Sequence, residues 1–181
     1  MARVSQSEMA VLGALSVRPM TGYAVREAIR TVLGHFWNES YGQIYPTLTR
    51  LHTEGLLDRH GGERSGSMTY SLTTAGRARL SELLRQPESP RPERNGLLLR
   101  LFFGRELGVD ACVELVQAAK VDAEQRLANY AAIRATMATE EEDRAHHPFW
   151  LLTVSAGEHG ARATLAWADE TLRTLRGLAA N

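Results

Sequence analysis

Two polar side chains in the stretch ESYGQIYPTLTRLHTEGLL, residues 39–57, have the chemistry needed to recognise DNA bases. Gln43 can form a pair of hydrogen bonds with adenine, and Arg50 can do the same with guanine. Gln43 also follows Ser40 by three residues, which is the spacing of a capping box. From the sequence alone, Gln43 could read a base, cap the helix or do neither.

The surrounding residues predict a helix over 40–54 with an outer face of low profile. Ile44, Leu48 and Leu51 recur at helical spacing and should face the core. A helix that only meets solvent usually shows Lys and Glu on its other side. Here that side carries mostly small groups: Gly42, Pro46, Thr49, Arg50 and Thr53. Such a face could enter the major groove, where Pro46 could touch a thymine methyl group.

Gly42 and Pro46 are unexpected residues near the start of a core helix. Pro46 has no N–H to donate to the Gly42 carbonyl four residues earlier, and its ring crowds that carbonyl. We expect this pair to produce a slightly loosened first turn.

The neighbouring segments predict the order of a winged helix-turn-helix. Helices are expected over 5–17, from residue 21 to about 34, over 40–54 and from Thr73 or Thr74 to about 85, with strands over 57–60 and 68–72. Tyr23, Val25 and Ile29 should form the apolar stripe of the second helix, and RPMTG before it should be a turn. A small α+β domain of another purpose would show the same order.

Three further groups could contact a DNA backbone. The tip of the predicted hairpin, GGERSGS, carries Arg64, Ser65 and Ser67, which could lie along phosphates or in a minor groove. The same tip could equally be a solvated turn. Tyr23 and Tyr45 could each contact a phosphate, although such tyrosines are more often core residues with the hydroxyl at the rim.

A proline-rich segment divides the chain. Residues 87–94 are expected to be a linker between a domain over 1–86 and a second domain over 95–181. The second half predicts helices over 97–105, 110–138 and 149–178. The last of these has an apolar seam close to a heptad repeat. Two helices of that length cannot bury their stripes alone, so we expect a helical hairpin that also pairs with a second subunit.

Five aromatic residues of the second half could line a pocket for a small-molecule effector, or could simply belong to the core or a dimer interface. They are Phe102, Phe103, Phe149, Trp150 and Trp167.

No pattern typical of an enzyme, a cofactor site or a metal site is evident. The sequence has no phosphate-binding loop, dinucleotide fingerprint or nucleophile–base arrangement. His146 and His147 are adjacent and therefore lack the i, i+4 spacing of a helical metal pair. We expect neither catalysis nor a cofactor nor a bound metal.

Composition favours a cytoplasmic protein that does not enter the membrane. The 181 residues include one cysteine, Cys112, which excludes an internal disulfide. No apolar run approaches the roughly 20 residues of a membrane span. The net charge is zero, but residues 1–86 hold 10 Lys and Arg against 7 Asp and Glu, whereas the remainder holds 11 against 14. The first half is thus slightly basic, which ordinary scatter of surface charge would explain as well.

Over about residues 8–84 the chain resembles the PadR family of bacterial transcriptional regulators. TGYAVREAI, FWNESYGQIYPTLTRLHTEGLL, a glycine-rich tip and MTYSLTTAGRARL follow in the order and spacing of that family. The matching residues are Gly22, Tyr23, Trp37, Gly42, Ile44, Tyr45, Pro46, Leu48, Leu51, Gly55, Leu56, Tyr70, Leu72, Thr73 and Gly76. The wing departs from many relatives because it carries little charge. The second half is similar to the larger PadR subfamily, whose C-terminal helices mediate dimerisation.

The resemblance implies a mainly α (α+β) fold, with a winged helix-turn-helix followed by a coiled-coil-like helical dimerisation domain. It implies a homodimer, usually a repressor, that binds double-stranded DNA at an inverted-repeat operator and is released by a small molecule or another signal. The residues expected to contact DNA are Ser40, Gly42, Gln43, Tyr45, Pro46, Thr47, Arg50, Tyr23, Arg64, Ser65 and Ser67. A winged-helix adaptor that binds proteins instead of DNA is the alternative, favoured by the neutral net charge.

Overall fold

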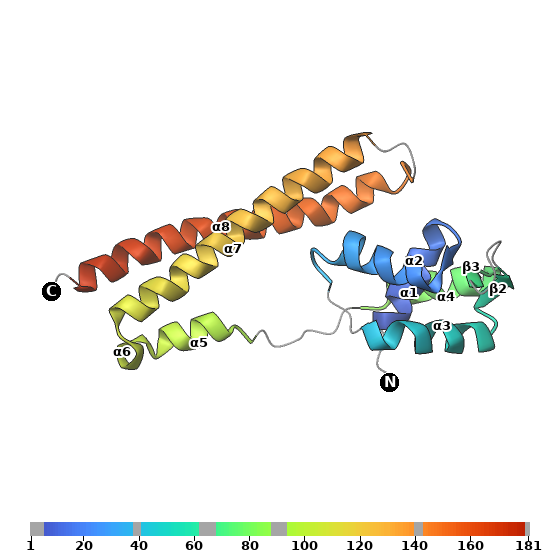
Figure 1. The fold of residues 1–181 in the computed structure, drawn as a ribbon, viewed down its shortest axis with the longest axis horizontal. Coiled ribbons are helices and arrows are strands. Elements are labelled where there is room, and N and C mark those ends of the chain that lie inside the picture. The colour runs from blue at the N-terminus through green and yellow to red at the C-terminus, as the bar shows by residue number, and fades with distance from the viewer. Residues whose placement is uncertain (1–5, 38–40, 62–67, 88–93, 140–142, 180–181) are drawn as a thin grey trace. The chain divides into compact units, whose positions relative to one another are not determined.

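The computed structural model describes residues 6–37, 41–61, 68–87, 94–139 and 143–179 (Figure 1). The chain divides into two compact units, residues 1–89 and 90–181. Most of the segment predicted as a linker, 87–94, lies outside the described residues.

The first unit is a group of packed helices with a small antiparallel sheet at one side. Its elements are α1 (Gln6–Val17), β1 (Met20–Thr21), α2 (Gly22–Ala28), a π-helical turn (Ile29–Leu33), a 3-10 turn (Tyr41–Gln43), α3 (Ile44–Thr53), β2 (Leu57–Gly61), β3 (Met68–Leu72) and α4 (Thr74–Arg85). The strands lie in the order β1-β3-β2, with Leu57 opposite Leu72 and Met20 opposite Tyr70. The winged-helix order predicted from the sequence is confirmed.

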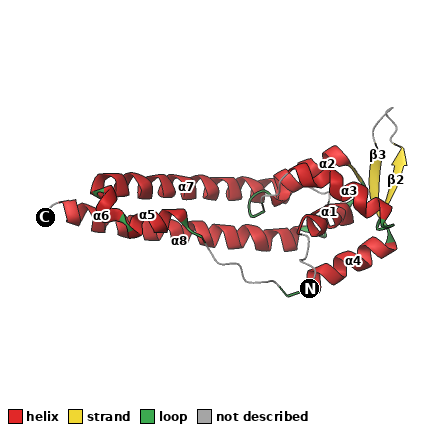
Figure 2. Ribbon diagram, turned by 90° about the horizontal axis from the view of Figure 1, so that it is seen from below, coloured by secondary structure: helices red, strands yellow, loops and turns green. Residues whose placement is uncertain are grey.

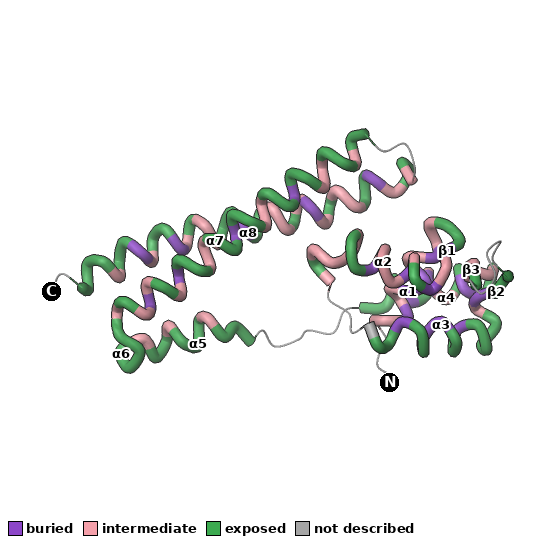
Figure 3. Tube along the Cα trace, viewed as in Figure 1, coloured by how far each residue is buried: buried purple, intermediate pink, exposed green. Residues whose placement is uncertain are grey.

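One core holds this unit together, and it contains the apolar positions of α1, α2, α3 and α4. Its buried members are Val11, Leu12, Leu15, Met20, Val25, Ile29, Ile44, Leu48, Leu51, Leu57, Leu80 and Leu83 (Figure 3). Tyr23 does not belong to it, because 64% of that residue is exposed. The prediction that Tyr23 shares the apolar stripe of α2 is therefore wrong.

Two features of this unit differ from the expected pattern. Met20 and Thr21 form the short strand β1 where a turn was expected, because they pair with β3, which is distant in sequence. The second helix ends in the π-helical turn Ile29–Leu33 instead of continuing as an α-helix. In that geometry a Cβ on Gly34 would lie 2.0 Å from the carbonyl oxygen of Arg30, so glycine is required there.

Thr73 fixes the start of α4 against the end of α3. Its hydroxyl lies 3.0 Å from the carbonyl oxygens of both Gly55 and Leu56, to which it can donate, and it accepts a hydrogen bond from the N–H of Gly76 at 3.0 Å. A Cβ on Gly76 would lie 2.1 Å from the Leu56 carbonyl oxygen, so only glycine permits this approach. Gly55 ends α3 with a φ of 72°, as a helix C-terminus commonly requires.

The second unit is a helical hairpin with two short helices before it. Its elements are α5 (Gly96–Phe102), α6 (Gly104–Leu107), α7 (Val109–Thr139) and α8 (His147–Ala179). Figures 1 and 2 show α7 and α8 side by side along most of their length. The predicted seam of α8 is confirmed as the packed face, with Val154, Ala161, Ala168 and Leu172 buried.

Ion pairs connect α7 to α8 at the margins of this seam. Lys120 Nζ lies 2.6 Å from Asp169 Oδ1, and Arg134 Nε lies 2.7 Å from Glu158 Oε1.

Among the described residues, no helix combines the length and apolar character that crossing a membrane requires.

Gly157 permits a close contact between α7 and α8. A Cβ at this position would lie 2.3 Å from the Tyr130 ring. We predict that Gly157→Ala lowers the free energy of unfolding by about 1–3 kcal/mol, because overpacking outweighs the gain in helix propensity. Denaturant unfolding of the full chain, followed by circular dichroism, measures the change.

Gly160 provides the matched control. It lies on the same helix with open space around its Cβ position. Gly160→Ala should therefore stabilise the chain by up to about 1 kcal/mol. Equal effects of the two substitutions would contradict the role given to Gly157.

Candidate nucleic-acid interface

The start of α3 explains how Pro46 is accommodated. The α-helix begins at Ile44, after the 3-10 turn Tyr41–Gln43, so Pro46 is its third residue. The first four N–H groups of a helix have no partner within it, and the missing N–H of Pro46 therefore breaks no helical hydrogen bond. The predicted loosening of a continuous helix is wrong, because Gly42 lies in the preceding 3-10 turn.

The outer face of α3 is exposed and has a low profile, as predicted. Gly42, Gln43, Tyr45, Pro46 and Thr49 are all exposed. Because few long side chains project from this face, the helix can approach another surface closely.

Thr47 is an exception among the residues expected to contact DNA. Only 7% of it is exposed, since it lies on the side of α3 that faces the core. The prediction that Thr47 contacts DNA is therefore wrong, because its side chain is buried in the folded unit.

Gln43 is the residue before α3, and its side chain forms no capping hydrogen bond with that helix. The other half of the predicted capping box, Ser40, lies outside the described residues. The exposed amide of Gln43 thus remains suited to base recognition.

Tyr45 and Tyr23 lie on the outside of the helix-turn-helix. The Tyr45 ring packs on Gly22 at the start of α2, where a Cβ would approach Tyr45 Cε1 to 2.8 Å. Tyr45 is 50% exposed and Tyr23 is 64% exposed. Neither is a core residue, so both hydroxyls are available to hydrogen-bond acceptors such as phosphate oxygens.

The later turns of α3 present hydroxyl and imidazole groups with fixed roles. The hydroxyls of Thr49 and Thr53 donate to the carbonyls of Tyr45 and Thr49 at 3.1 and 3.0 Å, which leaves them only as acceptors. His52 Nδ1 lies 2.9 Å from the Leu57 carbonyl oxygen. A carbonyl only accepts, so Nδ1 carries the hydrogen and Nε2 is left to face solvent.

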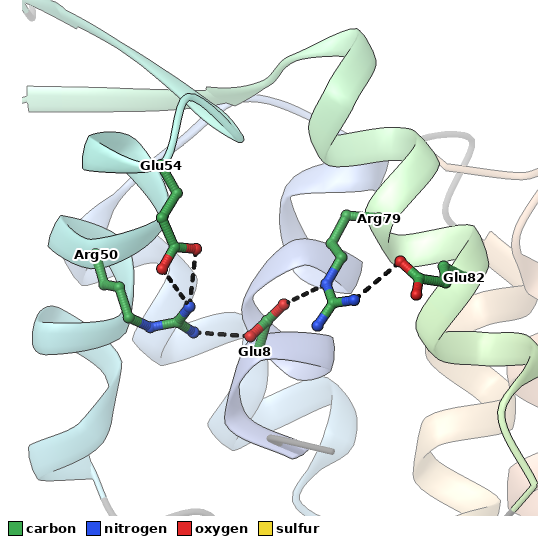
Figure 4. A network of polar contacts seen from close by, with 5 residues as sticks. All are labelled: Glu8, Arg50, Glu54, Arg79 and Glu82. Atoms are coloured by element: carbon green, nitrogen blue, oxygen red, sulfur yellow. Dashed lines mark hydrogen bonds and ion pairs between the residues drawn. The ribbon is translucent and has the colours of Figure 1, made fainter. Parts of the chain in front are cut away.

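Arg50 is not the free cation that its position on the helical wheel predicts. Figure 4 shows its guanidinium group between two carboxylates. Nη1 donates to both oxygens of Glu54 at 3.0 and 2.9 Å, and Nη2 donates to Glu8 Oε2 at 2.8 Å. Its side chain is still 43% exposed.

Glu8 of α1 also binds Arg79 of α4. Arg79 Nε donates to Glu8 Oε1 at 2.8 Å, and Arg79 Nη1 donates to Glu82 at 2.9 Å. A chain of alternating charges, Glu54–Arg50–Glu8–Arg79–Glu82, therefore connects α3, α1 and α4 (Figure 4). We call these five residues the charge chain.

Glu8 is the buried centre of the charge chain, with 6% of its side chain exposed. Burial is the largest single influence on its pKa and raises it. The hydrogen bonds from Arg79 and Arg50, together with their positive charges, more than offset burial and hold the pKa of Glu8 below its ordinary value of 4.5.

The predicted wing residues Arg64, Ser65 and Ser67 lie outside the described residues. The stem of the hairpin adds candidates that the sequence patterns did not single out. Arg59 and His60 are exposed on β2, and His60 Nε2 lies 3.3 Å from the Ser71 hydroxyl. In the sequence, Arg59 and His60 belong to a run of polar residues after Leu57. Strict alternation along a strand would instead have placed one of these two side chains inward.

The five aromatic residues suggested for an effector pocket do not form one pocket within the second unit. Phe102, Phe103 and Phe149 are 82%, 57% and 69% exposed. Trp150 stacks on His146 near the start of α8, about 25 Å along the helix from Trp167 at ~1.5 Å per residue. Trp167 instead lines an open groove with Leu97, Leu98, Ala119, Arg126 and Ala163. The proposed grouping is therefore wrong.

Two family models match this chain. Residues 11–82 match the model described as transcriptional regulator PadR-like family, and residues 93–176 match the model described as virulence activator alpha C-term. The negative transcriptional regulator PadR of Bacillus subtilis (strain 168) is 30% identical over 98 residues. That match covers 52% of this chain and 54% of the relative, so it spans about half of the relative's length.

Solved structures share the fold over nearly the whole chain. Bacillus subtilis PadR in complex with operator DNA gives a TM-score of 0.79 at 22% identity and covers 94% of this chain and 99% of the other. The same protein with p-coumaric acid gives 0.75 at 23% identity, covering 96% and 99%. The Vibrio cholerae virulence activator AphA gives 0.71 at 24% identity, covering 95% and 99%.

We predict that Glu8→Gln lowers the free energy of unfolding near neutral pH by about 2 kcal/mol, because two arginines lose their shared buried partner. The ionised carboxyl is favoured in the folded state, so its contribution is present above pH 4.5 and is lost as the pH falls through the lower folded pKa. The difference between wild type and Glu8→Gln should therefore shrink below pH 4.5 in urea unfolding series.

Glu82→Gln is the matched control, since it makes the same change at the exposed end of the charge chain. It should leave the free energy of unfolding nearly unchanged. If the wild type remains more stable than Glu8→Gln by the same free energy at low pH, the stabilising role given to the ionised Glu8 carboxylate is contradicted.

Proposed function

We propose that this chain, which matches the model described as transcriptional regulator PadR-like family over residues 11–82, is a homodimeric repressor that binds an inverted-repeat operator. The observation that carries this proposal is the exposed, low-profile face of α3, with Tyr45 packed on Gly22 beside it. A helix with that face fits a major groove closely. The complex of Bacillus subtilis PadR with operator DNA supports the same role here.

Five exposed residues of the first unit are assigned specific parts in DNA binding. We assign Gln43 to an adenine edge and Pro46 to a thymine methyl group. The hydroxyls of Tyr23 and Tyr45 are assigned to phosphates, as is the guanidinium of Arg59 on the stem of the wing. Ser40, Arg64, Ser65 and Ser67, outside the described residues, keep the DNA contacts expected from the sequence.

The second unit is proposed to hold two copies together. It leaves large apolar residues exposed toward both ends of the helical hairpin: Leu98, Leu99, Phe102, Phe103 and Leu107 along α5 and α6, and Phe149 and Leu152 at the start of α8. Several large apolar side chains left exposed near one another, as on α5 and α6, are typical of an interface. A two-fold dimer would place two α3 helices about one DNA turn apart, ~34 Å.

Repression and release by a small molecule are also part of the proposal. The negative regulator from Bacillus subtilis supports repression, and its p-coumaric acid complex supports a small aromatic effector. The Vibrio cholerae relative is a virulence activator. Expression of a reporter gene placed behind the operator therefore decides whether this protein represses or activates transcription. Lower expression in the presence of the protein is expected of a repressor.

We predict that selection from a pool of random-sequence duplexes enriches an inverted repeat whose half-sites are about 10 base pairs apart centre to centre. Sequencing of the bound fraction provides the readout. Small aromatic acids, p-coumaric acid first, are then tested for release of the enriched duplex. If no duplex is enriched at low salt, the protein-binding adaptor becomes the better interpretation.

Base contacts and phosphate contacts should be separable by mutation. Gln43→Ala should lower affinity for the enriched duplex about 5- to 100-fold while sparing mixed-sequence DNA. Arg59→Gln should weaken binding to both duplexes and make the salt dependence shallower by about 1 per subunit. Fluorescence anisotropy over a salt series measures both variants. Equal loss on both duplexes with Gln43→Ala would remove that residue from base recognition.

A further inference from the structure

Arg50 lies at the edge of the exposed face of α3, and carboxylates occupy both of its terminal nitrogens. Nη2 is bound to Glu8, which is buried, whereas Nη1 is bound to Glu54, which is 45% exposed. The two contacts therefore differ in how easily they exchange. An exposed ion pair is weak and readily replaced, but separating a buried carboxylate from its partner is costly.

Glu54 occupies a position where a carboxylate is otherwise unfavourable. It is the capping residue at the C-terminal end of α3, where the helix dipole is negative. The same end of the helix would lie near DNA phosphates if α3 occupied a major groove, and the Glu54 carboxylate would then repel them. Its favourable contact in the described structure is with Arg50, whose Nη1 donates to both of its carboxylate oxygens.

We propose that Glu54 limits the affinity of this protein for DNA by occupying Nη1 of Arg50, which could otherwise bind a phosphate. This inference rests on the proposed function. In the DNA-bound state Nη2 keeps its contact with Glu8, and Nη1 exchanges Glu54 for a phosphate oxygen. The fold is preserved through this exchange because Glu8 never loses Arg50.

The test compares wild type with Glu54→Gln, using a fluorescein-labelled duplex of about 30 base pairs of mixed sequence over a potassium chloride series. Glu54→Gln should bind about three- to tenfold more tightly, since Nη1 of Arg50 no longer has a competing anion. The dependence on salt should become steeper by up to about 1 per subunit. Thermal unfolding should confirm that the variant remains folded.

Two further variants separate release of Arg50 from a general change in charge. Glu82→Gln removes the same charge from the other exposed end of the charge chain, where Arg79 is its partner at 2.9 Å. It should change affinity less than twofold. Arg50→Gln keeps a hydrogen-bond donor for Glu8 without the charge, and in this background Glu54→Gln should give no gain.

The outcomes distinguish the inference from the function on which it rests. If wild type binds DNA but Glu54→Gln binds equally or more weakly, the inference is overturned and the proposed function stands. Equal gains from Glu54→Gln and Glu82→Gln also overturn it, because the effect would then be general electrostatics. If neither wild type nor Glu54→Gln binds DNA at low salt, the proposed function fails and the inference fails with it.

Discussion

A buried carboxylate on α1 connects three helices of the first unit. Glu8 is nearly inaccessible to solvent, and an ionised group there is tolerated only if its oxygens are paired. Arg50 supplies one partner from α3 and Arg79 supplies the other from α4. Because each oxygen has its own arginine, the position of α3 is linked to α1 and α4 by charge as well as by the apolar core.

The same interaction determines which groups of α3 remain available to a ligand. Arg50 is committed to the fold at one nitrogen and to an exposed carboxylate at the other, so the remaining outer face depends on Gln43, Pro46 and the two tyrosines. Tyr45 in turn depends on Gly22, which leaves room for its ring. Stability and recognition thus share side chains on one short helix.

Much of the framework followed from the sequence because its signals are local. The apolar spacing of Ile44, Leu48 and Leu51 predicted the buried side of α3, and the seam of α8 was visible in the same way. The strand β1 was not predictable, since two residues show no period and their pairing with β3 is long-range. The π-helical turn after α2 was missed for a different reason: helical spacing alone does not reveal an altered hydrogen-bond pattern.

The sequence by itself determined the winged-helix order, the two-part organisation and the low-profile face of α3, because these depend on periodicity, turn residues and residue size. Only the tertiary structure decided the partners of the charged side chains. Glu8, Arg50 and Arg79 lie far apart in the chain, and no spacing indicates that they meet. It also decided that Phe102, Phe103 and Phe149 are exposed and do not line a shared pocket within the second unit, because burial depends on which elements pack together.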